Sequence, residues 1–244
     1  MPAARIQPKT QKPDTVAVIL AELRTLAEPR NAVGARRFGI HNREILGVSI
    51  PKLRALAKRM GKNHGLAAAL WHAGILETRI LASLIDEPAK VTPRQMDNWV
   101  KDLESWADCD AVCGNLFDRT PHAVAKAEEW IGRSEEYVKR AGYVLMAALA
   151  VHDKVAADEL FLSFLPMIIR GSDNDRNFVK KAVNWALRQI GKRNVRLQAA
   201  AIQTAERIAA QNRPSARWIA ADALRELKRT KPKNLPHPAK ARVG

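Results

Sequence analysis

Apolar residues recur at three- and four-residue intervals through most of the chain, and no stretch shows the strict alternation of a half-buried strand. This period predicts amphipathic helices joined by short turns of Gly, Asp, Asn and Pro. In the second half the pattern predicts helices at 134–151, 154–169, 175–191, 195–211 and 214–229. We therefore predict an all-α chain of roughly a dozen helices and no sheet.

Residues that favour helix ends mark several boundaries. Ser, Thr and Asp favour the position before a helix, Pro favours its first turn, and Gly favours the position after its last turn. The candidate starts are Asp14–Thr15, Pro51, Thr92–Pro93 and Thr120–Pro121, and the candidate stops are Gly61 and Gly74.

Short segments repeat at offsets close to 40 residues. Residues 138–141 (VKRA) recur 41 positions later as 179–182 (VKKA), and residues 185–190 match 222–227 at an offset of 37. Paired helices with a period of about 40 are typical of HEAT or armadillo arrays, in which each repeat buries its apolar face against its neighbours. The sequence therefore predicts a HEAT-like solenoid that forms a single domain over residues 14–230.

The charge points to an anionic partner. Lys and Arg number 41 against 25 Asp and Glu, for a net charge of +16, which favours nucleic acid. More than half of this excess lies in residues 1–13 and 228–244, which contain no acid. We expect flexible basic segments at 1–13 and 231–244 that contact phosphates without sequence preference, although basic tails also serve solubility.

Within the solenoid, basic residues at equivalent repeat positions are expected to form a stripe on the concave face. The candidates are Arg140, Lys181 and either Arg217 or Arg225. Double-stranded DNA fits such a stripe.

The remaining features of the sequence argue against a membrane protein, a disulfide-rich protein and a metalloprotein. No apolar run approaches the roughly 18–20 residues of a membrane span, so we expect a cytoplasmic protein, associated with the nucleoid when bound to DNA. As a separate expectation, we take the protein to be a monomer. Cys109 and Cys113 are too few for a disulfide framework and are expected to be reduced, helix-packing residues. The six histidines are scattered, and we expect neither a metal nor a cofactor.

Trp106 and Asp110 are four residues apart, which places them on one face of a helix. An aromatic face beside a carboxylate suits a reaction that develops positive charge. Spacing alone equally fits a core tryptophan and a solvated or capping aspartate.

Arg140 borders the apolar stripe of a long helix, where a guanidinium requires an anion. Its partner is either an internal carboxylate or a backbone phosphate. Trp185 occupies a comparable place on the repeat-equivalent helix, where core packing is the simple alternative.

Four segments in order along the chain, 46–54 (LGVSIPKLR), 105–110 (SWADCD), 138–141 (VKRA) and 181–188 (KAVNWALR), resemble the bacterial DNA alkylation repair glycosylases of the AlkC/AlkD superfamily, which are HEAT-like solenoids. The chain departs from some members in having Ser105, and not a second tryptophan, before Trp106.

The resemblance implies roles for individual residues. Trp106 and Trp185 become aromatic walls, Asp110 the catalytic carboxylate and Arg140 a phosphate ligand. Phe38 and Ser49 fall where the family has further residues near the lesion.

The implied activity is that of a DNA glycosylase, which hydrolyses the N-glycosidic bond of N3- or N7-alkylated purines such as 3-methyladenine and 7-methylguanine in duplex DNA. Such a base is already cationic, so Asp110 stabilises positive charge on the deoxyribose and orients water. The alternatives are a noncatalytic HEAT-repeat scaffold that binds DNA and a HEAT module that binds protein.

Overall fold

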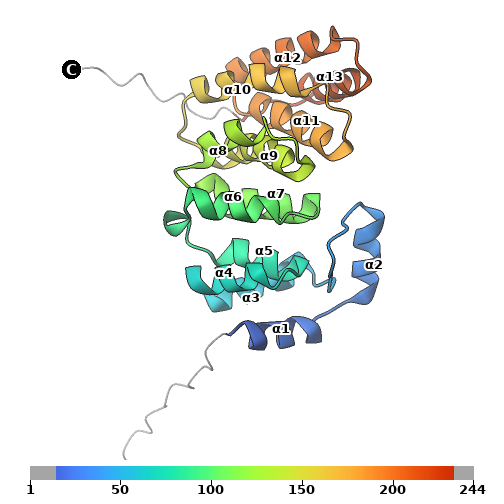
Figure 1. The fold of residues 1–244 in the computed structure, drawn as a ribbon. Coiled ribbons are helices and arrows are strands. Elements are labelled where there is room, and N and C mark those ends of the chain that lie inside the picture. The colour runs from blue at the N-terminus through green and yellow to red at the C-terminus, as the bar shows by residue number, and fades with distance from the viewer. Residues whose placement is uncertain (1–14, 234–244) are drawn as a thin grey trace, which may run out of the picture.

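The computed structural model describes residues 15–233 and consists there of thirteen α-helices and two short 3-10 helices. The helices stack one above another from α1 to α13, and α2 stands beside the stack (Figure 1). The only bridge of β type in the described part joins Glu44 to Ile75. The expected all-helical architecture is confirmed.

One layer of the stack contains the odd-numbered helices, each packed against the next from α3 to α13. Their bounds are α3 (Ile50–Met60), α5 (Leu76–Ile85), α7 (Trp106–Asn115), α9 (Glu136–His152), α11 (Asn177–Gly191) and α13 (Pro214–Leu227). The other layer is formed by α4 (His64–His72), α6 (Pro93–Lys101), α8 (Ala123–Trp130), α10 (Asp158–Gly171) and α12 (Val195–Ala209). The chain starts with α1 (Val16–Thr25) and α2 (Pro29–Arg37), and the 3-10 helices are η1 (Pro88–Lys90) and η2 (Phe117–Arg119).

The five helices expected in the second half are all present, and their ends lie within four residues of the expected ones. The helix that was expected to start at 154 begins at Asp158, because the Asp153 carboxylate accepts hydrogen bonds from the backbone amides of Val155 and Ala156 and holds a turn there.

Most boundary signals act as expected. The side chains of Thr15 and Thr92 accept hydrogen bonds from the backbone amides of Val18 and Gln95, and Gly61 follows the last turn of α3. Asp14 lies outside the described residues. Pro51 lies in the first turn of α3, and Gly74 lies two residues beyond the end of α4.

The start expected at Thr120–Pro121 was wrong. α8 begins at Ala123, and Thr120 instead follows η2. The Thr120 hydroxyl donates to the carbonyl of Phe117, three residues back, at the end of the 3-10 helix, and the N-cap position of α8 is occupied by His122.

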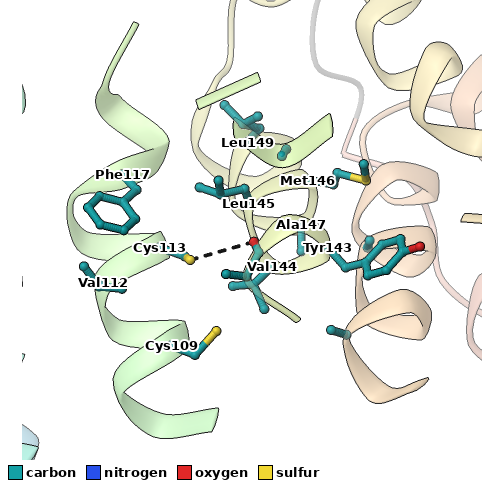
Figure 2. Close-up of a cluster of buried hydrophobic side chains, with 14 of the residues drawn as sticks. Cys109, Val112, Cys113, Phe117, Tyr143, Val144, Leu145, Met146, Ala147 and Leu149 are labelled. Atoms are coloured by element: carbon teal, nitrogen blue, oxygen red, sulfur yellow. Dashed lines mark hydrogen bonds between the residues drawn. The ribbon is translucent and has the colours of Figure 1, made fainter. Parts of the chain in front are cut away.

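The core is continuous along the stack, and its most buried helices are α5, with nine of ten residues buried, and α9, with twelve of seventeen. Figure 2 shows α7 packed against α9 through Cys109 and Cys113. The thiol of Cys113 donates to the carbonyl of Ala141 on α9, and both cysteines are buried and free, as expected. Trp106 and Asp110 share α7 with these packed cysteines, so the packing of α7 against α9 also fixes their direction.

Candidate active site

A cavity of about 730 Å³ opens along α7, α9, α11 and α13 and beneath the segment that follows α2. Its apolar wall consists of Phe38, Ile40, Trp106, Phe178, Trp185 and Trp218. Its polar groups are Asp110, Arg140, Lys181, Asn184, Arg188 and Asp222. Six residues expected at the site therefore line one cavity, although they come from four separate parts of the chain.

The start of α7 is fixed by a buried hydrogen-bond network around Asp108. Ser105 and Asp108 form a capping box, in which the side chain of each residue accepts a hydrogen bond from the backbone amide of the other. The Asp108 carboxylate, fully buried, also accepts from Asn42 (2.7 Å) and from Arg79 (3.0 Å). This network holds α7 against α5 and the 38–45 segment, so the direction of the first turn of α7 is set by groups outside that helix.

Trp106 connects α7 to the rim of the cavity. Its indole nitrogen donates to the carbonyl of Phe38 at 2.9 Å, and the Phe38 side chain is 75% exposed. The next residue, Gly39, has φ +80°, and a Cβ there would lie 2.7 Å from the ring of Phe178. Only glycine fits this position without displacing the ring. The hydrogen bond from Trp106 and the ring of Phe178 therefore both constrain the backbone of residues 38–39 at the cavity edge.

Asp110 and Arg140 form an ion pair with two hydrogen bonds. Arg140 Nε donates to Asp110 Oδ1 at 3.0 Å and Nη2 donates to Oδ2 at 2.8 Å, while Nη1 donates to the carbonyl of Phe178 at 2.5 Å. Arg140 is only 5% exposed. Of the two partners that the sequence left open for Arg140, the internal carboxylate is the one bound in this structure.

Burial raises the pKa of Asp110 above its ordinary 3.8, and the guanidinium of Arg140 opposes that rise. For Arg140, burial acts to lower the pKa, but the Asp110 carboxylate outweighs it and the pKa is raised. The guanidinium thus stays charged and favours an ionised Asp110 at the cavity wall.

The remaining sequence-derived candidates separate into two groups. Trp185 and Lys181 both lie on α11 and line the cavity; Trp185 is half-buried and Lys181 is exposed. Ser49 precedes α3 at its N-cap position and is not among the cavity residues.

The expected basic stripe is only partly formed along the cavity. Arg217 is exposed on α13 and donates to Asn212, and it does not line the cavity. Arg225 is paired with Asp222. Lys181 is the one stripe candidate that faces the cavity without an acidic partner within the described part of the chain.

Several residues of the site were missed by the sequence analysis, namely Ile40, Phe178, Asn184, Arg188, Trp218 and Asp222. One signal was available for Asp222, which matches Trp185 in the repeat at an offset of 37. No cluster of three or more His, Cys, Asp or Glu suited to a metal occurs among residues 15–233. None of the described helices is long and apolar enough to cross a bilayer.

The fold and the cavity together define an all-helical, HEAT-like repeat protein with a carboxylate–guanidinium pair in an aromatic cleft. Residues 19–227 match the family of DNA alkylation repair enzymes, and the chain therefore belongs to that family.

Two relatives illustrate the similarity. The uncharacterized protein Lin0241 of Listeria innocua serovar 6a is 26% identical over 126 residues, which cover 50% of this chain and 56% of Lin0241. The chain thus matches little more than half the length of this curated relative. A solved structure superposes with a TM-score of 0.74 at 20% identity and covers 90% of this chain and 98% of its own. It is described as a member of a new family related to the HEAT-like repeat DNA glycosylases, with affinity for branched DNA structures, and the likeness confirms the HEAT-like fold.

Proposed function

We propose that this protein is a DNA glycosylase that hydrolyses the N-glycosidic bond of N3- or N7-alkylated purines, such as 3-methyladenine and 7-methylguanine, in double-stranded DNA. The observation that carries this proposal is the Asp110–Arg140 pair at the wall of an aromatic cavity, in a chain that belongs to the DNA alkylation repair enzyme family.

In the proposed reaction the bond between C1′ and the purine nitrogen breaks, and its electron pair neutralises the cationic base. The base therefore needs no protonation to leave. Positive charge develops on the deoxyribose, where the Asp110 carboxylate stabilises it and orients a water molecule. The water adds to C1′ and loses a proton, which completes the hydrolysis.

Trp106 and Trp185 are the proposed walls of the reacting sugar. Both are half-buried and line the cavity that contains Asp110. Indole faces attract a developing cation and exclude water from it. The hydrogen bond from Trp106 to Phe38 fixes the ring of Trp106 and also supports the proposed contact of Phe38 with the DNA.

Arg140 is proposed to position Asp110 and to reach a phosphate beside the lesion. The guanidinium has five N–H groups, and the bonds to Asp110 and Phe178 occupy three of them. The other two are the donors proposed for the phosphate. Lys181 supplies a second phosphate contact from the exposed side of the cavity, and Ser49 is a proposed DNA contact outside it.

We further propose that residues 14–230 act as a single domain and bind the duplex as a monomer in the cytoplasm. The continuous core supports the first part of this proposal.

A noncatalytic DNA-binding scaffold is the second candidate, because a protein with the same fold is described as having affinity for branched DNA structures. Asp110 argues against it, since a carboxylate in a phosphate-facing cleft weakens DNA binding unless it takes part in chemistry.

The deciding assay is release of 3-methyladenine and 7-methylguanine from methylated duplex DNA by the purified full chain. We expect both bases to appear as free products. Tight, salt-sensitive binding to duplex or branched DNA without any base release would favour the scaffold instead.

A further inference from the structure

The end of the cavity formed by α11 and α13 contains polar groups that the proposed hydrolysis does not use. Asn184 is 2% exposed, and its side-chain nitrogen donates to Asp222 Oδ2 at 2.6 Å. Because an ionised carboxylate only accepts hydrogen bonds, the amide nitrogen must face Asp222. This arrangement leaves Asn184 Oδ1 buried without a hydrogen-bond partner, a costly state unless a ligand donates to that end of the cavity.

Asp222 is a second carboxylate in the cavity. One oxygen accepts from Asn184 and the other from Arg225, but a carboxylate has about four lone-pair positions, so each oxygen has capacity for another donor. The side chain is 22% exposed. Its charge is offset by Arg225 and by Arg188, whose Nε lies 3.8 Å from Oδ2, and its remaining lone pairs favour a ligand that bears N–H groups.

Trp218 lies next to this polar pair, on the same helix as Asp222 and one turn before it. Its side chain lines the cavity and is 41% exposed. The ammonium of Lys180 lies over the ring, 5.0 Å from its centroid. The adjacent Lys181 is exposed on the cavity side.

We propose that Trp218, Asn184 and Asp222 form a subsite for one unpaired nucleotide whose base carries an exocyclic amino group. The base stacks on the indole of Trp218, its amino group donates to Asp222 next to Asn184 Oδ1, and its phosphate contacts Lys181. Aromatic side chains bind unpaired bases through their π faces, and basic neighbours bind the backbone. The proposal rests on the proposed function only in assuming that this cavity faces DNA.

The test measures equilibrium affinity for duplexes with a single bulged nucleotide and no alkylated base. The bulge carries adenine, thymine or an abasic tetrahydrofuran, and fluorescence anisotropy gives Kd at one fixed salt concentration. For the wild-type chain we expect adenine to bind roughly tenfold more tightly than the abasic bulge, and more tightly than thymine, which lacks an amino group.

Two variants separate stacking from recognition of the amino group. Trp218→Leu, at an exposed position, should lose the preference for adenine over the abasic bulge, and Trp218→Phe should restore part of it. Asp222→Asn should lose the preference for adenine over thymine but keep the preference for a base over the abasic site. Val195→Ala, exposed on α12 away from the cavity, is the control and should change neither ratio.

The proposal is overturned if wild type binds the three bulges equally or if Trp218→Leu keeps the full preference. A uniform gain in affinity for all three bulges in Asp222→Asn would show that Asp222 only repels DNA through its charge. That result would overturn its proposed role in recognising the amino group. Because no alkylated base is present, these results are independent of the base-release assay, and failure of either test leaves the other intact.

Discussion

The carboxylate of Asp110 on α7 is bound at both oxygens by the guanidinium of Arg140 on α9, 30 residues further along the chain. The pair joins two neighbouring helices and also places a negative charge at the cavity wall. Its structural and chemical roles are separable by experiment, because removal of either partner affects the fold and the reaction in different ways.

Removal of Arg140 alone should be more destabilising than removal of the whole pair. Arg140→Met leaves the Asp110 carboxylate without its partner in a poorly solvated place, and we expect a loss of about 3 kcal/mol in the free energy of unfolding. In Asp110→Leu/Arg140→Met the stranded charge is gone, and most of that loss should be recovered. Urea unfolding of wild type, both single variants and the double variant gives the coupling free energy. Strictly additive losses would mean that the two residues do not stabilise each other.

The pH dependence of base release should report on Asp110. Burial raises the pKa of Asp110, and the reaction needs the ionised form, so the rate should fall with decreasing pH at a midpoint above the ordinary 3.8. Arg140→Gln removes the cation that opposes the rise and should move this midpoint to higher pH, whereas Arg140→Lys should move it less. Single-turnover rates across pH measure the midpoint. A midpoint that is the same in wild type and Arg140→Gln would exclude Asp110 as the titrating group.

The raised pKa of Asp110 also makes the free energy of unfolding depend on pH, in the direction opposite to that of the reaction rate. The folded protein binds this proton more tightly than the unfolded chain, so the contribution of Asp110 is fully present below pH 3.8 and is lost as pH rises through the raised pKa.

Lys181 should contribute to DNA affinity through counterion release. It is exposed at the cavity and has no acidic partner among the described residues. Lys181→Gln should therefore reduce the slope of log K against log salt by about 0.9, the value for one phosphate contact on B-DNA. Lys101→Gln, on the outer helix α6, removes the same charge away from the cavity and is the matched control. Equal slopes for the two variants would place the phosphate contact elsewhere.

Arg193 should be essential for stability although it is remote from the cavity. Its guanidinium donates to the carbonyls of Ala150 (2.8 Å) and Asp153 (2.7 Å) and lies 3.9 Å from the ring centroid of Phe161. Arg193→Met leaves buried carbonyls unpaired and should cost about 2–3 kcal/mol. Thermal unfolding measures the loss.

The control for that loss is an arginine whose ion pair lies wholly at the surface, which excludes the nearby Arg196. Because Arg196 also lies 3.8 Å from the buried carboxylate of Asp158, the matched control is Arg133, which pairs with Glu135 at the surface; Arg133→Met should keep a Tm close to that of wild type. Equal losses in the two variants would show that the buried hydrogen bonds of Arg193 add no more to stability than a surface ion pair does.

The sequence predicted those features that depend on neighbours a few residues away. Thr92 caps α6 because its hydroxyl meets an amide three residues later, and Trp106 and Asp110 share a face because four residues make about one turn. Thr120 shows the limit of this reasoning, since the same Thr–Pro pattern follows a 3-10 helix here and α8 starts three residues later.

Features that depend on contacts between distant helices were not accessible from the pattern. The choice of Asp110 as the partner of Arg140 and the place of Asp222 beside Asn184 depend on how neighbouring repeats pack across about 30 to 40 residues of chain. Trp218 could not be distinguished from a core tryptophan, because its spacing is helical and its exposure is set by the helices around it.

The most direct test of the central claim is the single-turnover rate of base release by Asp110→Asn on methylated duplex DNA, with DNA affinity and Tm measured on the same preparation. The change keeps the size of the side chain and removes its charge. We predict a rate roughly 100- to 1,000-fold below that of wild type, with affinity for duplex DNA that is unchanged or tighter. Release at the wild-type rate by the folded variant would contradict the assignment of Asp110 as the group that stabilises the deoxyribose cation.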